Sequence, residues 1–125
     1  MRKLTKDEVK FSVEIESEDM QVRGNYMCTE DPESDKKDED EILARLERGD
    51  IFAWCVIKVT AKWEEFEGFA IIGGVSFSED ENGMKQAEIE AEEYGLHEEA
   101  LDQLNKEINA YVMNAKDIAM RLINV

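Results

Sequence analysis

Residues 51–63 read IFAWCVIKVTAKW and give the strongest secondary-structure signal in the chain. Every odd position of this stretch is apolar, which is the period of two of a β-strand with a buried face. The even positions are apolar up to Val56 and polar from Lys58 onward. The pattern predicts a strand that is covered on both faces at its start and is central in its sheet.

Three further strands are predicted around this one. Apolar and polar residues alternate over residues 9–16, and a weaker alternation follows over residues 20–28, where Gly24 interrupts it as a bulge would. These two strands form a first hairpin. After a turn at residues 64–68, a returning strand over residues 69–77 contains the pair Gly73 and Gly74, which indicates a bulge or a close backbone contact.

Three helices complete the predicted order. Asp38, with Glu41 three residues later, begins a short helix that Gly49 ends. A second helix covers residues 84–94, and a third of roughly 25 residues starts near Leu96, with apolar residues three and four positions apart. The order β-β-α-β-β-α-α predicts an α+β fold, an antiparallel four-stranded sheet packed against a long C-terminal helix.

The composition favours one domain over residues 1–125. Apolar residues make up 42% of the 125 residues, which is enough for a core although 37% are charged. Residues 29–37 have no large apolar side chain and are expected to form a mobile acidic loop. No stretch has the length and hydropathy of a membrane span or a leader, so we expect a cytoplasmic location. Cys28 and Cys55 are expected to be reduced thiols.

The charge of the chain is uneven. The net charge is −16, and residues 30–99 hold 22 acidic against 7 basic residues. An acidic surface repels nucleic acid and anionic lipid, so we expect no direct nucleic-acid binding and no membrane binding. A partner selected by charge would be basic, and nucleic-acid-binding proteins are the obvious class.

The sequence motifs do not indicate an enzyme. Residues 78–83 place Asp80 and Asn82 as in a calcium loop, but Ser78 and Ile89 stand where carboxylates are needed, so a β-to-α turn is the better interpretation. His97 is the single histidine and is expected to lie at the surface or to cap a helix. We therefore expect no catalytic residue, no metal site and no cofactor.

The acidic residues suggest a surface that imitates the phosphates of DNA. Glu88 and Glu92 are one helical turn apart, a rise of about 6 Å. Trp63 and Phe66 are candidate apolar anchors beside this charge. The predicted partner-binding residues are Glu30, Asp31, Glu33, Asp35, Asp38, Glu39, Asp40, Glu41, Trp63, Glu64, Glu65, Phe66, Glu67, Glu81, Glu88, Glu92, Glu98 and Glu99. The alternative is that the acids only confer solubility.

The C-terminal helix is nearly neutral, since residues 100–125 carry three acidic and three basic residues. It is therefore the part of the chain least opposed by charge to meeting a second copy. Its apolar stripe fits a core helix or a dimer seam, and a homodimer through residues 100–123 is possible.

The segments 49–61, 66–68 and 73–77 together resemble the core of small acidic accessory proteins encoded by phages and plasmids. Such genomes also encode inhibitors of host defence, including anti-restriction and anti-CRISPR proteins, some of which imitate DNA. By analogy, the resemblance implies an inhibitor that occupies a basic nucleic-acid-binding surface of a defence complex. It transfers no functional residue. The competing hypothesis is a dimeric structural adaptor.

Overall fold

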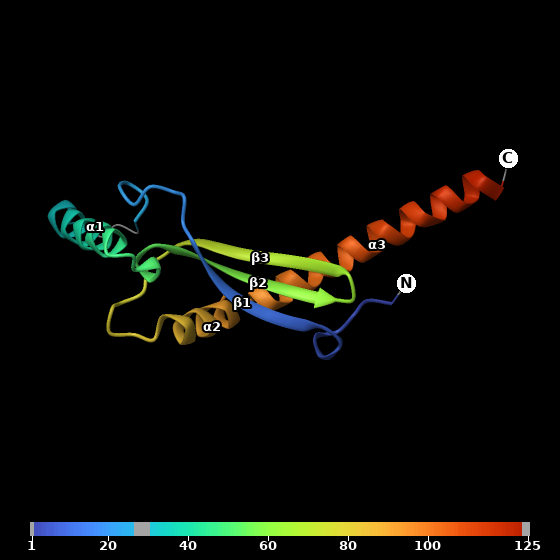
Figure 1. Cartoon of the computed structure of the whole chain (residues 1–125), viewed down its shortest axis with the longest axis horizontal. Coiled ribbons are helices and arrows are strands. Elements are labelled where there is room, and N and C mark those ends of the chain that lie inside the picture. Colours follow the sequence, from blue (N-terminus) through green and yellow to red (C-terminus); the bar gives the residue numbers. More distant parts are fainter. Residues whose placement is uncertain (1, 27–30, 124–125) are drawn as a thin grey trace. The chain divides into compact units, whose positions relative to one another are not determined.

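The structure is a computed structural model that describes residues 2–26 and 31–123 (Figure 1). These residues form an α+β fold with one sheet. The strands are β1 (Lys10–Ser17), β2 (Cys55–Trp63) and β3 (Phe66–Val75). The α-helices are α1 (Pro32–Glu47), α2 (Gly83–Glu93) and α3 (Leu96–Ile123), and two short 3₁₀ helices are η1 (Lys6–Glu8) and η2 (Ile51–Ala53).

The described sheet is antiparallel, with three strands in the order β1-β2-β3 (Figure 1). The predicted central position of the strand over residues 51–63 is confirmed, but the strand begins at Cys55 and not at residue 51. Residues 51–53 form η2, whose N-cap Asp50 accepts the backbone N–H of Phe52 at 3.2 Å.

The prediction of four strands is wrong, because residues 20–26 form a turn instead of a strand. Gly24 has a φ of +79°, and the backbone N–H groups of Asn25 and Tyr26 both donate to the carbonyl of Val22 at 3.1 Å. The Trp54 indole N–H donates a hydrogen bond to the backbone carbonyl of Met20 at 2.7 Å. These backbone groups of residues 20–26 therefore bond to a side chain or within the turn, and not to a neighbouring strand. Cys28, at the end of the predicted strand, lies outside the described residues.

The chain divides into two compact units, and each strand contributes to both. Unit 1 comprises Met1–Ser12, Val59–Ala70 and Gly95–Val125, and unit 2 comprises Val13–Lys58 and Ile71–Tyr94. Segments distant in the sequence therefore meet within each unit. Unit 1 contains α3 and the hairpin turn between β2 and β3, whereas unit 2 contains α1 and α2.

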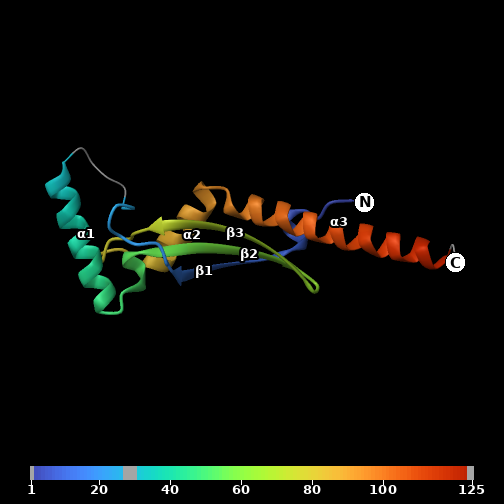
Figure 2. The same cartoon turned by 90° about the horizontal axis from the view of Figure 1, so that it is seen from above.

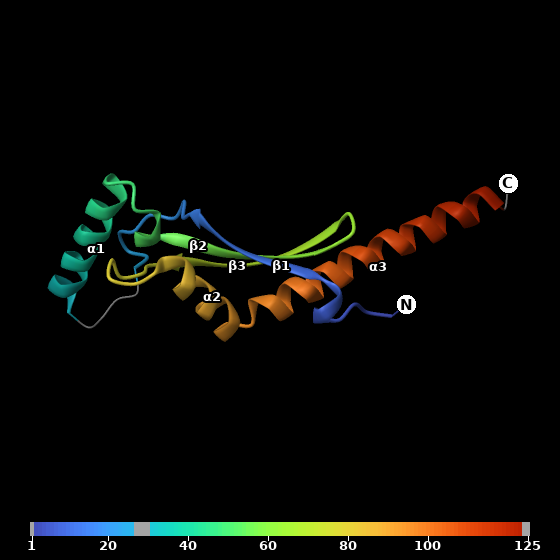
Figure 3. The same cartoon turned by 60° about the horizontal axis from the view of Figure 1, so that its bottom comes forward.

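In the core of unit 2, α1 packs against the segment that precedes β2. Val22, Ile42, Ala53 and Trp54 are buried together, and α1 lies next to η2 (Figure 3). The predicted start of this helix at Asp38 and the predicted loop over residues 29–37 are wrong over residues 32–37.

Helix α1 begins at Pro32, because Asp31 caps it by accepting the backbone N–H of Glu33 at 3.1 Å. Proline suits the first helical position, where its missing N–H would have no helical partner. Gly49, with a φ of +84°, follows the helix C-cap, so its predicted role in ending this helix is confirmed.

In unit 1, α3 packs on the sheet with its first turns. Leu96, Ala100 and Leu104 are buried, and a Cβ atom at Gly68 of β3 would lie 2.3 Å from the backbone nitrogen of Leu104. The close backbone approach is thus at Gly68, five residues before the predicted glycine pair. Beyond this contact, α3 continues past the β2–β3 turn (Figure 2).

The returning strand starts earlier than predicted. The turn consists only of Glu64 and Glu65, with Glu64 at a φ of 53°, so β3 begins at Phe66 and not at residue 69. The small residues Gly68 and Ala70 are buried, whereas 62% of Ile71 is exposed. Among the described helices, none is long and apolar enough to cross a membrane.

Candidate functional site

The negative charge is concentrated in unit 2. This unit contains 21 acidic and 7 basic residues, a net charge of −14, whereas unit 1 contains 10 acidic and 8 basic residues, a net charge of −2. The sequence alone places the excess broadly over residues 30–99. Of the 16 net negative charges of the chain, the structure assigns 14 to unit 2. The acids of the hairpin turn and of α3 belong to unit 1, where eight basic residues offset most of them.

Two of the predicted partner-binding acids on α1, Glu39 and Asp40, form ion pairs and a hydrogen bond with the turn at residues 23–24 of the same unit. The Arg23 guanidinium pairs with Glu39 at 3.4 Å and also with Asp40, and the backbone N–H of Gly24 donates to Glu39 at 3.0 Å. The hydrogen bond from Arg23 lowers the pKa of the Asp40 carboxyl. These acids stabilise the turn that replaces the predicted strand, so part of their charge is neutralised within the unit.

The other predicted acids on α1 have different environments. Asp31 is the helix cap, Asp35 is only 9% exposed, and Glu33 is exposed in the first turn. Asp38 and Glu41 line a cavity. Glu30, also predicted as partner-binding, lies outside the described residues.

The outer face of α2 is the clearest acidic row. Ala87 and Ala91 are buried on the inner face, so Glu88 and Glu92 are exposed on the outer face, one helical turn and about 6 Å apart. Glu81 is exposed in the turn just before the helix. Three of the predicted residues are thus held in one unit, on or beside one helix.

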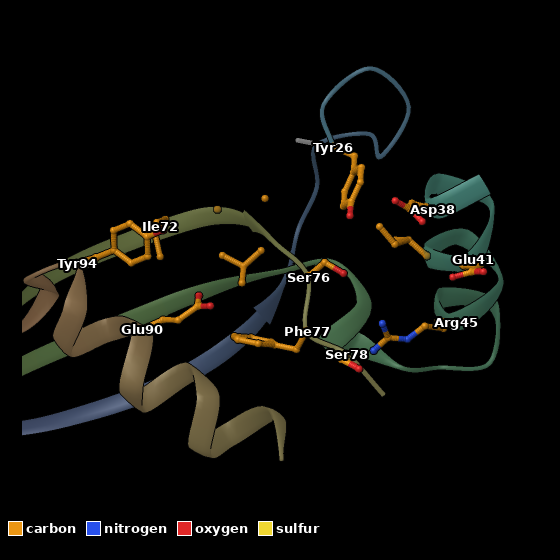
Figure 4. Close-up of a pocket in the computed structure, with 14 residues that line it drawn as sticks. Tyr26, Asp38, Glu41, Arg45, Ile72, Ser76, Phe77, Ser78, Glu90 and Tyr94 are labelled. Atoms are coloured by element: carbon orange, nitrogen blue, oxygen red, sulfur yellow. The ribbon is translucent and has the colours of Figure 1, made fainter. Parts of the chain in front are cut away.

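A cavity of about 510 Å³ lies between α1, the end of β3 and α2, all within unit 2. Figure 4 shows Tyr26, Asp38 and Arg45 on one side of it, with Glu90 and Tyr94 on the α2 side. Partial burial, and then the neighbouring carboxylates of Glu93 and Glu81, raise the pKa of the Glu90 carboxyl. Burial is also the main cause that raises the pKa of the Tyr26 phenol.

The cavity is suited to a cation. Arg45 lines the cavity, but its guanidinium is already paired with Asp50 at 2.9 Å and with Glu79 at 3.5 Å. The carboxylates of Asp38, Glu41 and Glu90 also line the cavity, as do the rings of Tyr26, Phe77 and Tyr94. Carboxylates and aromatic faces together attract ammonium and guanidinium groups. The arrangement can therefore receive a lysine or arginine side chain of a partner.

The predicted anchors at the hairpin turn contact one another. The rings of Trp63 and Phe66 stack with centroids 6.4 Å apart, and Phe66 meets Tyr111 of α3 edge-on at 5.2 Å. Trp63 and Phe66 are half-buried, and their role as partner anchors stays a prediction. The predicted acids Glu64, Glu65 and Glu67 are exposed in and beside the turn.

Glu98 and Glu99, predicted to extend the acidic row of α2, belong to unit 1 and not to unit 2. Glu98 pairs with Lys6, and this hydrogen bond is the main cause that lowers the pKa of its carboxyl. Glu99 is exposed. The predicted row is therefore divided between the two units.

The remaining chemical candidates have structural roles. The His97 ring, half-buried in the first turn of α3, packs edge-on against Phe11 at 5.1 Å. Cys55 is a buried free thiol whose Sγ donates to the carbonyl of Val75 at 3.4 Å, and burial raises its pKa to about 11. Asn82, in the calcium-like stretch, caps α2 by accepting the backbone N–H of Lys85 at 3.2 Å. Over residues 2–26 and 31–123, no group of three or more His, Cys, Asp or Glu is arranged to hold a metal ion.

Sequence reasoning missed the cavity and four of its titratable residues, Tyr26, Arg45, Glu90 and Tyr94. Residues 26, 45 and 94 come from three segments, and no periodicity in the sequence brings them together. Only Glu90 gave a usable signal, because it is spaced three residues from Ala87 and therefore lies near the buried face of α2.

Comparison of the chain with protein-family profiles, with curated proteins and with solved structures found no match.

Proposed function

We propose that this chain is a non-enzymatic binding protein whose unit 2 occupies a basic, nucleic-acid-binding surface of a protein partner. The observation that carries the proposal is the segregation of charge, −14 on unit 2 against −2 on unit 1. A net charge of a few units is enough for solubility, and a larger one destabilises the compact state by self-repulsion. An excess confined to one unit acts as a directional field that steers a basic partner.

In this proposal, the acidic row of α2 and the cavity have different roles in binding the partner. Glu81, Glu88 and Glu92 present exposed carboxylates to the lysine and arginine side chains with which such a surface neutralises phosphates. The cavity supplies a site for one lysine or arginine side chain between carboxylates and tyrosine rings. The row provides attraction over distance, and the cavity provides specificity at contact.

The biological setting is proposed from the resemblance of residues 49–77 to phage and plasmid accessory proteins. In that setting the partner is a host defence nucleoprotein complex of the CRISPR or restriction type in the bacterial cytoplasm. Inhibition proceeds by occupancy, as a mimic of DNA, and requires no reaction.

The test begins with affinity capture from a bacterial lysate and continues with the purified partner. We expect the partner to be basic and the affinity to fall at least about tenfold as NaCl rises from about 0.1 M to about 0.5 M. Duplex DNA should compete with the chain for the partner. A partner that is neutral or acidic, or an affinity indifferent to salt, contradicts the proposal.

Two charge-reversed variants locate the surface. The first carries Glu81→Lys, Glu88→Lys and Glu92→Lys in unit 2, and the matched control carries Glu64→Lys, Glu65→Lys and Glu67→Lys in unit 1. All six residues are exposed, and the net charge changes equally in both variants. We expect the unit 2 variant to lose binding and the control to keep most of it. Equal losses would show that the partner responds to net charge and not to the surface of unit 2.

The competing function is a dimeric adaptor whose acids only confer solubility. It is favoured by the exposed apolar residues of α3, which the charge-based proposal does not use. If the chain is such an adaptor, the variant with Glu81→Lys, Glu88→Lys and Glu92→Lys should bind the captured partner as tightly as the wild type.

A further inference from the structure

The C-terminal half of α3 exposes an unusual amount of apolar surface. Every residue from Met113 to Ile123 is exposed, and α3 continues past the hairpin turn of unit 1 (Figure 2). The large apolar side chains are Tyr111 at 62%, Met113 at 58%, Ile118 at 48%, Met120 at 63%, Leu122 at 72% and Ile123 at 78% exposed. Side chains of this size gathered along one helix mark an interaction surface.

Part of this surface follows the spacing of a coiled coil. Apolar residues recur at alternating intervals of three and four along α3, at Leu101, Leu104, Ile108, Tyr111, Ala115, Ile118 and Leu122. A repeat of 3.5 residues drifts around a straight helix and stays on one line only when two helices supercoil. The first part of this seam, at Leu104, is buried within unit 1, but the seam from Ala115 onward is exposed.

We propose that residues 108–122 of α3 form the seam of an antiparallel homodimer, an interaction separate from the acidic surface of unit 2. The charge of the helix favours a second copy as the occupant. Residues 109–123 carry Lys116, Arg121 and Asp117, a net charge of +1 in a chain of −16, and Asp117 pairs with Arg121 at 3.1 Å. The residues flanking the exposed seam are Val112, Asn114, Ala119 and Arg121, none of them acidic. Two copies therefore meet here without acidic side chains placed against each other along the exposed seam.

The charge at the start of α3 sets the orientation. Glu98, Glu99 and Asp102 are exposed in the first two turns, and the chain enters α3 directly from unit 2 at Tyr94. A parallel pair would place these acids against their own copies, whereas an antiparallel pair that overlaps only in the C-terminal halves keeps them apart. The opposed helix dipoles favour the same orientation.

The residues of the seam fit this antiparallel register. When Ala115 of one copy faces Ile118 of the other, Tyr111 faces Leu122, so each pairing joins a smaller with a larger side chain or an aromatic with an aliphatic one. The small Ala115 lies next to the two-fold axis, where the helices approach most closely. Every pairing occurs twice, as a symmetric dimer requires.

The oligomeric state of the full-length chain tests the seam, measured by sedimentation equilibrium over a range of concentrations. We expect a reversible dimer whose Kd rises at least about a hundredfold in the variant Ile118→Asp and Leu122→Asp, since each buried carboxylate would be unpaired. The matched control carries Met113→Asp and Met120→Asp, which lie on the same helix, are equally exposed and fall outside the seam. Leucine and methionine have similar helix propensities and isoleucine a slightly lower one, so the seam variant loses no more helix propensity than the control. Circular dichroism should therefore show closely similar helix content.

A wild-type chain that stays monomeric at about 0.2 mM overturns the proposal, because that concentration corresponds to a binding free energy of only about 5 kcal/mol. A control variant that dissociates as fully as the seam variant also overturns it.

Disulfide trapping tests the orientation in a Cys28→Ser background, in which the remaining Cys55 is buried. One chain carries Ala115→Cys and the other Ile118→Cys. We expect a mixture of the two to form a covalent dimer faster than either chain alone. If the Ile118→Cys chain alone cross-links faster than the mixture, the helices are parallel and the antiparallel dimer is refuted.

Discussion

Replacing Gly68 with alanine should separate α3 from the sheet. A Cβ atom at this position would lie 2.3 Å from the backbone nitrogen of Leu104, 2.4 Å from the carbonyl oxygen of Ala100 and 2.7 Å from the Cα of Leu104. All three atoms belong to the helix backbone, so no rotamer change relieves the overlap. The helix as a whole must retreat by about 1 Å to restore ordinary contact distances.

The cost follows from the packing that this retreat removes. A gap of about 1 Å forfeits up to roughly half of the dispersion energy of each contact across it. Leu96 and Leu104 are the large buried side chains of α3, and each contributes about 1.5 to 3 kcal/mol when fully buried. The expected destabilisation is therefore about 2 to 3 kcal/mol, within the range of overpacked cores. In urea unfolding followed by circular dichroism, this should appear as a lower midpoint, and in heating as a Tm lower by roughly 10 °C.

Gly73→Ala provides the control on the same strand. The nearest atom to its Cβ would be the Glu18 carboxylate oxygen at 3.0 Å, which a flexible side chain can move. Alanine also restricts the unfolded chain, so this variant should match the wild type or exceed it by about 0.5 kcal/mol. A Gly68→Ala variant as stable as the Gly73→Ala variant would refute the packing of α3 against β3.

Two further substitutions test unit 2. Glu90→Gln should raise the free energy of unfolding at pH 7, because burial raises the folded-state pKa of Glu90 and stability is lost as pH rises from the unfolded-state pKa through the folded-state pKa. Thermal unfolding should show this gain shrinking as pH falls below about 4, and Glu88→Gln, at an exposed position of the same helix, is the matched control for the amide substitution. Asp31→Ala should cost about 1 kcal/mol in urea unfolding by removing the cap of α1, and an unchanged midpoint would place the start of the helix elsewhere.

The elements that could be predicted from sequence are those with a local pattern. Residues 55–63 alternate without interruption and form the central strand, and Asn82 and Gly95 bracket α2 within one residue of the prediction. The start of α1 could also have been predicted, since Asp31 followed by Pro32 is a typical helix cap and first helical residue. A loop was predicted there because residues 29–37 have no large apolar side chain. The predicted second strand is wrong for one local and one non-local reason. Locally, the backbone N–H groups of Asn25 and Tyr26 donate to the carbonyl of Val22 in a turn, and non-locally the Trp54 indole donates to the carbonyl of Met20.

The candidate site depends on contacts that the sequence does not encode locally. The order of the acids along the chain suggested one row from Glu81 to Glu99, but the boundary at Gly95 assigns the last two acids of that row to unit 1. The cavity draws Tyr26, Arg45 and Tyr94 from three separate segments, and only the packed unit brings them together. Composition located the charge, and tertiary structure determined which surface carries it.

The two proposed surfaces differ in their response to salt, which lets them be separated in one experiment. Binding through unit 2 depends on opposite charges and should weaken as screening increases. Pairing through α3 buries apolar side chains while two chains of net charge −16 repel each other, so the same screening should strengthen it. A complex that loses its basic partner with rising salt while the chain itself shifts from monomer to dimer would therefore require both surfaces, since neither one alone produces opposite salt dependences.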